Sequence, residues 1–223
     1  MDRRGRGASG PLRPDHSLEV EYGDVAAVAS AGRALRSGRA GRAGPPVHLV
    51  GHSSGARCAL HAALGIENLA SLVLYEPPAP ENLSEEVLGR LGVLEAAADR
   101  EGILRTFFVD AVGDDEDSFA SLRERPVWPL MLDNALTVPA ELRAVRHYRL
   151  DLAGFAALDV PTLLLLGELS GPEVAAATGA IARALPRASV TTLAGQGHGA
   201  MFAAPELLAA AIEGFIDGAG WRK

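Results

Sequence analysis

The sequence of 223 residues is short of cysteine, of long apolar runs and of positive charge. Its one cysteine, Cys58, cannot form an internal disulfide, and a small buried residue in a reducing compartment is the natural interpretation. No run approaches the roughly 18 apolar residues that a membrane-spanning helix needs. The arginines at the start of the chain are not followed by an apolar segment, so a secretory signal is not indicated. We therefore expect a cytoplasmic protein with no membrane partner.

The charge balance and the spacing of polar residues disfavour a nucleic-acid-binding protein and a metal-binding protein. With 21 basic and 28 acidic residues the net charge is −7, which argues against general nucleic-acid binding. Residues 1–15 are rich in Arg, Gly and Pro and fit either a disordered basic arm that touches phosphates or, over residues 2–9, a loop. The acidic run at 114–117 lacks the glycine and the spaced ligands of a calcium loop. No Cys/His cluster has metal-ligand spacing, so we expect neither a metal nor a cofactor.

Apolar runs rich in leucine and valine alternate with helical patterns, which predicts a mostly parallel sheet covered by helices on both faces. The strands are expected at 47–50, 69–75, 163–166 and 189–193. Helices are expected at 18–36, 56–64, 173–185 and about 205–216. A Gly/Arg/Pro-rich linker is expected at 37–46.

The pattern between residues 81 and 152 is different and predicts a helical cap inserted into the core. Residues 1–80 and 153–223 would form the two parts of that core. Four helical stretches are expected in the cap, with breaks at Gly102, at Gly113 and at the Pro126/Pro129 pair, and a helix start with Thr137 as its cap. Five of the eleven aromatic residues lie here and favour a small or medium apolar substrate: Phe107, Phe108, Phe119, Trp128 and Tyr148.

The segment Gly51-His52-Ser53-Ser54-Gly55 joins a predicted strand to a predicted helix. A serine at the tip of such a tight turn exposes its hydroxyl, and the first turn of the helix directs free N–H groups and a positive dipole end at it. We expect Gly51 and Gly55 to be glycine because the strand and the helix pass too close for a side chain at either place. Ser53 is therefore the candidate nucleophile.

Taken together, the sequence resembles the α/β-hydrolase family from Asp2 to the C-terminus, with the helical lobe where that family carries its cap. The order and spacing of five segments make the resemblance specific: Asp-Arg-Arg-Gly-Arg-Gly-Ala-Ser (2–9), Gly-His-Ser-Ser-Gly (51–55), Tyr-Glu-Pro-Pro (75–78), Val-Pro-Thr-Leu-Leu-Leu-Leu-Gly (160–167) and Gly-His-Gly (197–199).

The resemblance implies that Ser53 is the nucleophile, that His198 is its general base, and that the backbone N–H of Ser54 is one oxyanion-hole donor. A serine hydroxyl is a poor nucleophile unless an imidazole removes its proton, so the chemistry asks for the same pair. For the other five histidines structural or surface roles are expected: His16, His48, His52, His61 and His147.

The orienting acid is where the chain departs from the family pattern. The family usually places an aspartate three residues after the glycine that ends the strand before the last, and that position is Ser170 here. Glu168, directly after Gly167, and Glu76, after the neighbouring strand, are the two candidates. We favour Glu76 and keep Glu168 as the alternative. A structural role for Glu76, capping the entry to the lobe, is a third interpretation.

The function that this resemblance implies is hydrolysis of an ester or similar small acyl substrate through an acyl-enzyme. Cofactor-free haloperoxidases and carbon–carbon bond hydrolases share the same triad, so the bond that is cleaved stays open. The alternative is a truncated, catalytically impaired hydrolase-fold protein that binds a ligand or partner.

That alternative arises from the start of the chain. In the family a strand precedes the segment that begins at Asp2, and here only Met1 does. We expect Met1 to be an internal residue of a longer protein that supplies four strands and a helix, on the order of 50 residues. Without them the fold would be N-terminally incomplete, with one oxyanion donor missing. The strand before Ser53 would be a sheet edge through which the chain could form a homo-oligomer.

Overall fold

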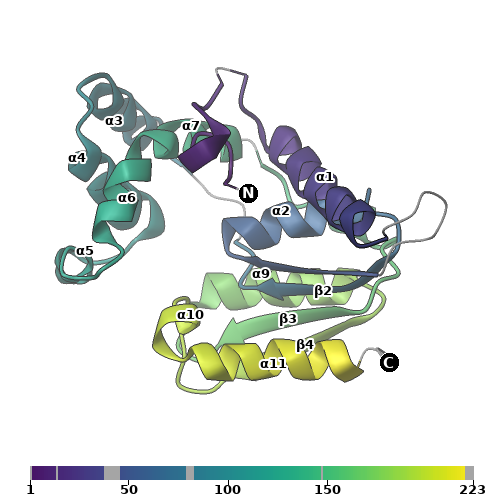
Figure 1. Cartoon of the computed structure of the whole chain (residues 1–223). Helices are drawn as coiled ribbons and strands as arrows, with labels where there is room; N and C mark the ends of the chain where they lie inside the picture. Colours follow the sequence, from purple (N-terminus) through teal and green to yellow (C-terminus); the bar gives the residue numbers. More distant parts are fainter. Residues whose placement is uncertain (1, 14, 38–45, 79–82, 147, 219–223) are drawn as a thin grey trace. The chain divides into compact units, whose positions relative to one another are not determined.

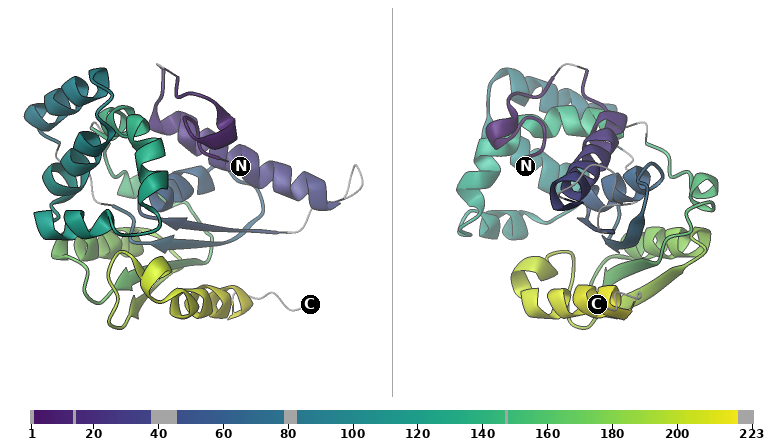
Figure 2. Two further views of the ribbon diagram at one scale, coloured as in Figure 1. Left: turned by 60° about the vertical axis from the view of Figure 1, so that its left-hand side comes forward. Right: turned by 45° about the vertical axis from the view of Figure 1, so that its right-hand side comes forward.

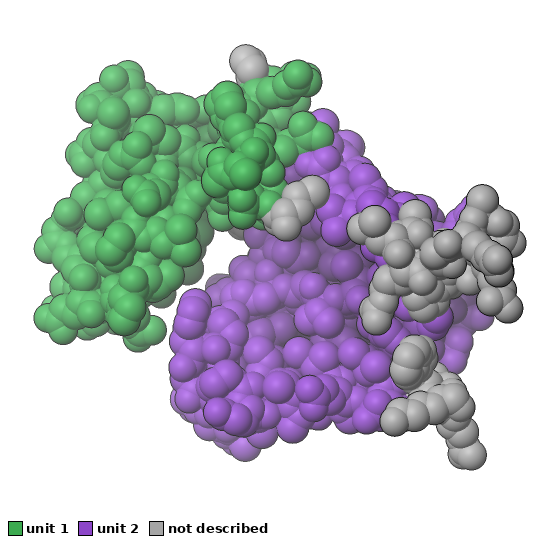
Figure 3. Space-filling model, viewed as in Figure 1, with its two compact units in different colours: residues 1–18, 80–149 green, residues 19–79, 150–223 purple. Residues whose placement is uncertain are grey.

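The computed structural model describes residues 2–13, 15–37, 46–78, 83–146 and 148–218 (Figure 1). The chain divides into two compact units, coloured separately in Figure 3. Unit 1 comprises Met1–Leu18 and Pro80–Arg149, and unit 2 comprises Glu19–Ala79 and Leu150–Lys223. The first 18 residues thus group with the helical segments, a division that the sequence did not indicate. Most of the expected linker at 37–46 lies outside the described residues.

Unit 2 is built on a four-stranded sheet in the order β1-β2-β3-β4, and every neighbouring pair is parallel. The four predicted strands are confirmed: each begins within two residues of its expected start and ends within two of its expected end. Because the strands are parallel and adjacent in chain order, all four carboxyl ends meet at one edge of the sheet. The strands are β1 (Val47–His52), β2 (Leu69–Tyr75), β3 (Thr162–Gly167) and β4 (Ala188–Leu193).

Strand β1 has the outer position that the sequence predicts for it. Within the sheet that the described residues form, it pairs with β2 on one side only. Val50, in the middle of β1, is 47% exposed. The strand that leads to Ser53 is therefore held by a single neighbour.

Alternating residues of the inner strands pack into two separate cores, one on each face of the sheet. Leu72 and Leu74 of β2 pack with residues of α1, α2, α8 and α9. Val73 and Tyr75 of the same strand pack with α10 and α11, which lie on the opposite face (Figures 1 and 2). The helices of this unit are α1 (Leu18–Ser37), α2 (Ser54–Ala63), α8 (Leu152–Phe155), α9 (Pro172–Ala184), α10 (Ala200–Ala203) and α11 (Pro205–Gly218).

Unit 1 is helical in its described residues and contains more segments than the four expected. One of them, η2, is a π-helix, a form that is rare and short. The ring of Phe119 meets Trp128 edge-on at 5.8 Å between centroids. The segments are α3 (Glu85–Ala96), α4 (Arg100–Arg105), η2 (Thr106–Val112), α5 (Glu116–Leu122), α6 (Trp128–Asn134), η3 (Ala135–Thr137) and α7 (Val138–Val145).

The predicted boundaries in this unit were partly wrong. Gly102 lies inside α4, and the break comes earlier, at Ala98, whose φ is 53°. Asp99 then caps α4, because its carboxylate accepts from the N–H of Gly102 at 2.9 Å. Thr137 precedes α7 as expected but does not cap it with its side chain: its hydroxyl donates to the carbonyl of Asn134 at 2.9 Å. The break at Gly113 is confirmed, since its φ of 91° ends η2.

The arginine-rich start of the chain forms a closed turn, with the short 3₁₀-helix η1 (Gly7–Ser9) in it. Asp2 accepts from the N–H of Ala8 at 2.9 Å and from the hydroxyl of Ser9 at 2.5 Å. The guanidinium of Arg6 donates to Glu141 of α7 at 2.7 Å. These contacts favour the loop interpretation over a free phosphate-binding arm.

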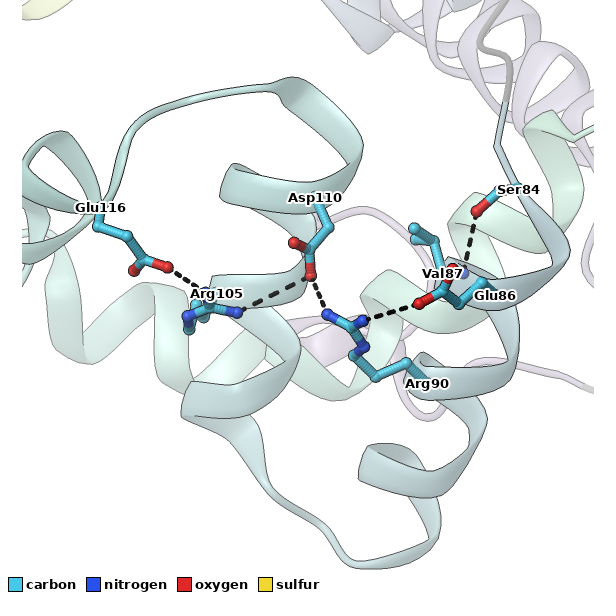
Figure 4. Close-up of polar contacts among 7 residues, drawn as sticks. All are labelled: Ser84, Glu86, Val87, Arg90, Arg105, Asp110 and Glu116. Atoms are coloured by element: carbon cyan, nitrogen blue, oxygen red, sulfur yellow. Dashed lines mark hydrogen bonds and ion pairs between the residues drawn. The ribbon is translucent and has the colours of Figure 1, made fainter.

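A chain of ion pairs links four helical segments of unit 1, α3, α4, η2 and α5 (Figure 4). Arg90 of α3 donates to Asp110 of η2 at 2.7 Å and to Glu86 at 3.3 Å. Arg105 contacts both Asp110 and Glu116. Such exposed pairs add little stability, so we interpret the network as one that orients the segments. Every helix in the described part of the chain is too short or too polar to cross a membrane.

Candidate active site

The carboxyl edge of the sheet carries the residues that follow each strand. The parallel ladder continues one residue past β1, β2 and β3. The N–H of Ser53 donates to the Tyr75 carbonyl at 2.9 Å, and that of Glu76 donates to the Leu165 carbonyl at 3.1 Å. The N–H of Glu168 donates to the carbonyl of Leu193, the last residue of β4, also at 3.1 Å. These bonds hold Ser53, Glu76 and Glu168 in a row beside the loop that contains His198.

Ser53 occupies a strained turn between β1 and α2. Its φ is 53° and its ψ is −125°, a combination that non-glycine residues rarely adopt. The strand and the helix approach closely at Gly51, where a Cβ would lie 2.5 Å from the Gly55 carbonyl oxygen and 2.7 Å from the Cα of Ala56. The same explanation is wrong for Gly55, because a Cβ there would meet nothing within 4 Å.

The first turn of α2 begins directly after Ser53. The carbonyl of Ser53 accepts from the N–H groups of Ala56 and Arg57, at 2.8 and 3.2 Å. The N–H of Ser54 precedes these two, in the first turn, where a helix has no backbone acceptor for it.

His198 is joined to Glu76 by a short hydrogen bond of 2.6 Å between Nδ1 and Oε2. The His198 side chain is 53% exposed, whereas that of Glu76 is fully buried. The other carboxylate oxygen of Glu76 accepts from the N–H of Gly167 at 2.7 Å and from the hydroxyl of Ser170. Glu76, like Ser53, has a positive φ, of 47°, and this strained conformation occurs directly after its strand.

These contacts determine the ionisation of Glu76 and the tautomer of His198. Burial favours the neutral acid, but hydrogen bonds from His198, Ser170 and Gly167 outweigh it and lower the pKa of Glu76 below its ordinary value. An ionised carboxylate only accepts hydrogen bonds, so the Nδ1 of His198 carries the proton. The Nε2 of a neutral His198 is then free to accept a proton from a substrate or a nucleophile.

The structure separates the two candidate acids. Glu76 contacts His198, whereas the Glu168 carboxylate accepts from the backbone N–H of Gly195 at 2.7 Å. Ser170, at the position where the family usually has its aspartate, donates its hydroxyl to Glu76. Glu76 is thus the carboxylate that the structure brings to His198, and Ser170 supports it.

Two residues at this edge were missed by the sequence reasoning. His52 directs Nε2 at the carbonyl of His198, 3.0 Å away, and because a carbonyl only accepts, this nitrogen carries a proton. Burial and the neighbouring charge of His198 lower the pKa of His52 to about 4. Tyr75 donates its hydroxyl to the carbonyl of Gly197. The sequence signal that could have found them is their position: His52 directly precedes Ser53, and Tyr75 directly precedes Glu76.

Two further histidines of unit 2 make contacts away from the His198–Glu76 pair. His48 pairs with the Ser71 hydroxyl at 2.7 Å. His61 stacks on Tyr22 with 4.4 Å between the ring centroids. His147 lies outside the described residues, and His16 belongs to unit 1. No group of three or more His, Cys, Asp and Glu residues in the described part of the chain is arranged to hold a metal ion.

The fold and this edge define a class: a parallel α/β protein with a strained serine turn and a histidine–carboxylate pair at the carboxyl ends of its strands. The chain belongs to the alpha/beta hydrolase family, whose model matches residues 1–211. A search of curated proteins found no match.

Among solved structures, the chain is similar to an alpha/beta hydrolase from Sphaerobacter thermophilus. The two share 30% identity with a TM-score of 0.79, over 96% of this chain and 79% of the other. An esterase from Thermogutta terrifontis is 21% identical, with a TM-score of 0.68 over 98% of this chain and 78% of its own. An enol-lactonase from Burkholderia xenovorans is 16% identical, with a TM-score of 0.68 over 97% and 79%. At these lower identities the likeness shows the fold alone.

Proposed function

We propose that this protein is a serine hydrolase of esters or similar small acyl substrates, with Ser53 as nucleophile, His198 as general base and Glu76 as the acid that orients it. The observation that carries the proposal is the 2.6 Å bond between His198 Nδ1 and Glu76 Oε2. A carboxylate in this place holds the imidazole in one tautomer and stabilises the imidazolium that forms during the reaction. Family membership supports a hydrolase.

In the proposed reaction the Ser53 oxygen attacks the substrate carbonyl while His198 Nε2 takes the serine proton. The bond to the leaving group then breaks, and the leaving oxygen takes that proton from His198, which leaves Ser53 acylated. Water repeats the sequence: it loses a proton to His198 and attacks the acyl carbon, and Ser53 leaves with the proton. At the end of each half of the reaction, His198 is again in the neutral form that is bonded to Glu76.

The oxyanion that forms in each half of the reaction needs backbone donors. The N–H of Ser54 is the proposed donor, because it lies in the first turn of α2 beside Ser53. The positive end of the helix dipole adds to it. In other enzymes the loss of one such donor costs about 3–4 kcal/mol of transition-state stabilisation.

An exposed leucine in the turn after β3 favours an apolar substrate. Leu169 is 71% exposed, a high value for a large apolar side chain. Its N–H donates to the carbonyl of Gln196 at 2.8 Å, which holds Leu169 next to the loop that carries His198. We propose that this leucine contacts the acyl or alcohol part of the substrate.

The test uses a fluorophosphonate probe and a series of p-nitrophenyl esters. Ser53→Ala should abolish ester turnover and probe labelling while leaving the circular dichroism spectrum unchanged. Ser189→Ala, a change at the amino end of β4 in the same unit, is the matched control and should keep both. Labelling at a serine other than Ser53, or full turnover in Ser53→Ala, would contradict the assignment. A folded wild-type protein with neither turnover nor labelling would favour a binding module instead.

A further inference from the structure

Tyr75 touches all three parts of the site described above. It is the last residue of β2, so Glu76 follows it directly in the chain. Its carbonyl accepts from the N–H of Ser53 at 2.9 Å. Its hydroxyl reaches the loop of His198, on the face of the sheet that α10 and α11 cover.

The Tyr75 hydroxyl contacts that loop on both sides of His198. It donates to the carbonyl of Gly197, the residue before His198. It also accepts from the N–H of Ala200, two residues after His198, at 3.3 Å. One oxygen atom therefore fixes the two ends of the short segment that carries the imidazole, and it uses both its donor and an acceptor site to do so.

The Tyr75 ring itself is held firmly. The residue is 2% exposed and packs in the core between the sheet and α11. The ring of His52 lies against it at 5.0 Å between centroids. A buried tyrosine has few rotamers open to it, so its hydroxyl is a fixed point for the loop. Burial also raises the pKa of Tyr75, so the hydroxyl keeps its proton at neutral pH.

A fixed point is needed here because the loop is otherwise rich in glycine. Gly195, Gly197 and Gly199 surround His198, and glycine leaves the backbone the most freedom. The bond between His198 and Glu76 has to be kept while the imidazole gains and loses a proton. A displacement of about 1 Å at such a group can cost about 100-fold in rate.

We propose that Tyr75 is a positioning residue, which holds the backbone on both sides of His198 so that the imidazole stays aligned with Glu76. The inference rests on the proposed function, in which His198 is the base. It assigns to Tyr75 a part in turnover that is separate from its packing in the core.

The test compares Tyr75→Phe with Tyr22→Phe, a hydroxyl deletion on α1 in the same unit. Tyr75→Phe keeps the buried ring and removes only the hydroxyl. It should lower kcat for ester turnover by about 10- to 100-fold and leave KM within about twofold, because binding of the ground state is not changed. Tyr22→Phe should leave both constants at their wild-type values.

A spectroscopic measurement separates positioning from a loss of stability. The proton between His198 Nδ1 and Glu76 should give a far-downfield proton NMR signal in the wild type, and this signal should broaden or vanish in folded Tyr75→Phe. A variant that is less stable but keeps the signal and the wild-type kcat would overturn the proposal. If Tyr75→Phe does not fold, the wild-type protein supplies the decisive measurement: its Tyr75 hydroxyl proton should exchange slowly and show a nuclear Overhauser effect to the Ala200 amide. The lack of that effect would overturn the proposal.

Failure of this inference can be told from failure of the proposed function. If Ser53→Ala is inactive and Tyr75→Phe is fully active, only the role of Tyr75 is wrong. If Ser53→Ala keeps its turnover, the nucleophile is wrong, and the NMR signal of the His198–Glu76 pair still tests Tyr75.

Discussion

Protonation of His52 should destabilise the folded protein in mild acid. Its pKa is lowered from 6.5 to about 4, first because the ring is partly buried and second because His198 lies beside it. Two contacts oppose this shift: the hydrogen bond to the His198 carbonyl and the negative charge of Glu76. The net result is a histidine that the folded state keeps neutral in a pH range where the unfolded chain binds a proton.

The sign and the size of the effect follow from this difference. Between about pH 6.5 and about pH 4 the unfolded state binds more protons at this site, so stability falls as the pH falls. The values 6.5 and about 4 correspond to about 1.8 kcal/mol lost between about pH 7 and about pH 5. Because the ring is partly exposed to water, screening should reduce the loss to about 1 kcal/mol.

The measurement compares urea unfolding of the wild type with that of His52→Gln over this pH range. Glutamine keeps an N–H donor for the His198 carbonyl but does not titrate, so the wild type should lose about 1 kcal/mol more than the variant. Proton NMR of the His52 ring gives the pKa directly. A midpoint near 6.5, or parallel losses in the two proteins, would refute the reasoning.

Three further predictions follow from the same edge of the sheet. Glu76→Gln should lower kcat far more than Glu168→Gln. The comparable loss of charge in a serine protease triad costs about 10⁴ in rate, whereas an amide at position 168 can still accept from a backbone N–H. The reverse order in steady-state assays would move the acid to Glu168. Leu169→Ser should raise KM for longer acyl chains by about 5- to 10-fold with little change in kcat, and equal KM values across a chain-length series would contradict its proposed contact. Gly51→Ala should destabilise the fold by about 1–3 kcal/mol because its Cβ would meet backbone atoms of α2. Gly55→Ala, in open space on a helix, should be neutral or stabilising. Equal shifts in melting temperature would show that β1 and α2 do not approach closely at Gly51.

The sheet was predictable because its signals are local. Each buried strand is a short run of apolar residues, and β2, for example, ends where Tyr75 meets Glu76 and two prolines. The turn at Ser53 was predictable for a similar reason, since a strand, a small-residue turn and a helix follow one another directly. The helical unit was less predictable. Its helix break lies at Ala98 and not at Gly102, because the Asp99 carboxylate caps the next helix, and such side-chain capping depends on the three-dimensional geometry.

The choice of acid depended on distances between strands that are far apart in the sequence. Tyr75 pairs with Leu165, so Glu76 lies level with the last residues of β3 and comes within reach of Ser170. Neither that register nor the positive φ of Glu76 can be read from the residues alone. The same holds for the Tyr75 hydroxyl: a buried tyrosine usually finds a hydrogen-bond partner, but the sequence does not show that this partner is the loop of His198.

The outer position of β1 gives the two halves of the site unequal resistance to local opening. Among the residues that the structure describes, Ser53 follows a strand paired with β2 alone, whereas Glu76 follows β2, which has a neighbour on each side. Segments with fewer buried hydrogen bonds open at a lower free energy than the rest of a protein. As denaturant is added, the β1–α2 turn should therefore loosen first, while the carboxylate and the imidazole remain paired. The protein would then lose ester turnover at a denaturant concentration at which it keeps its secondary structure and the NMR signal of the His198–Glu76 pair.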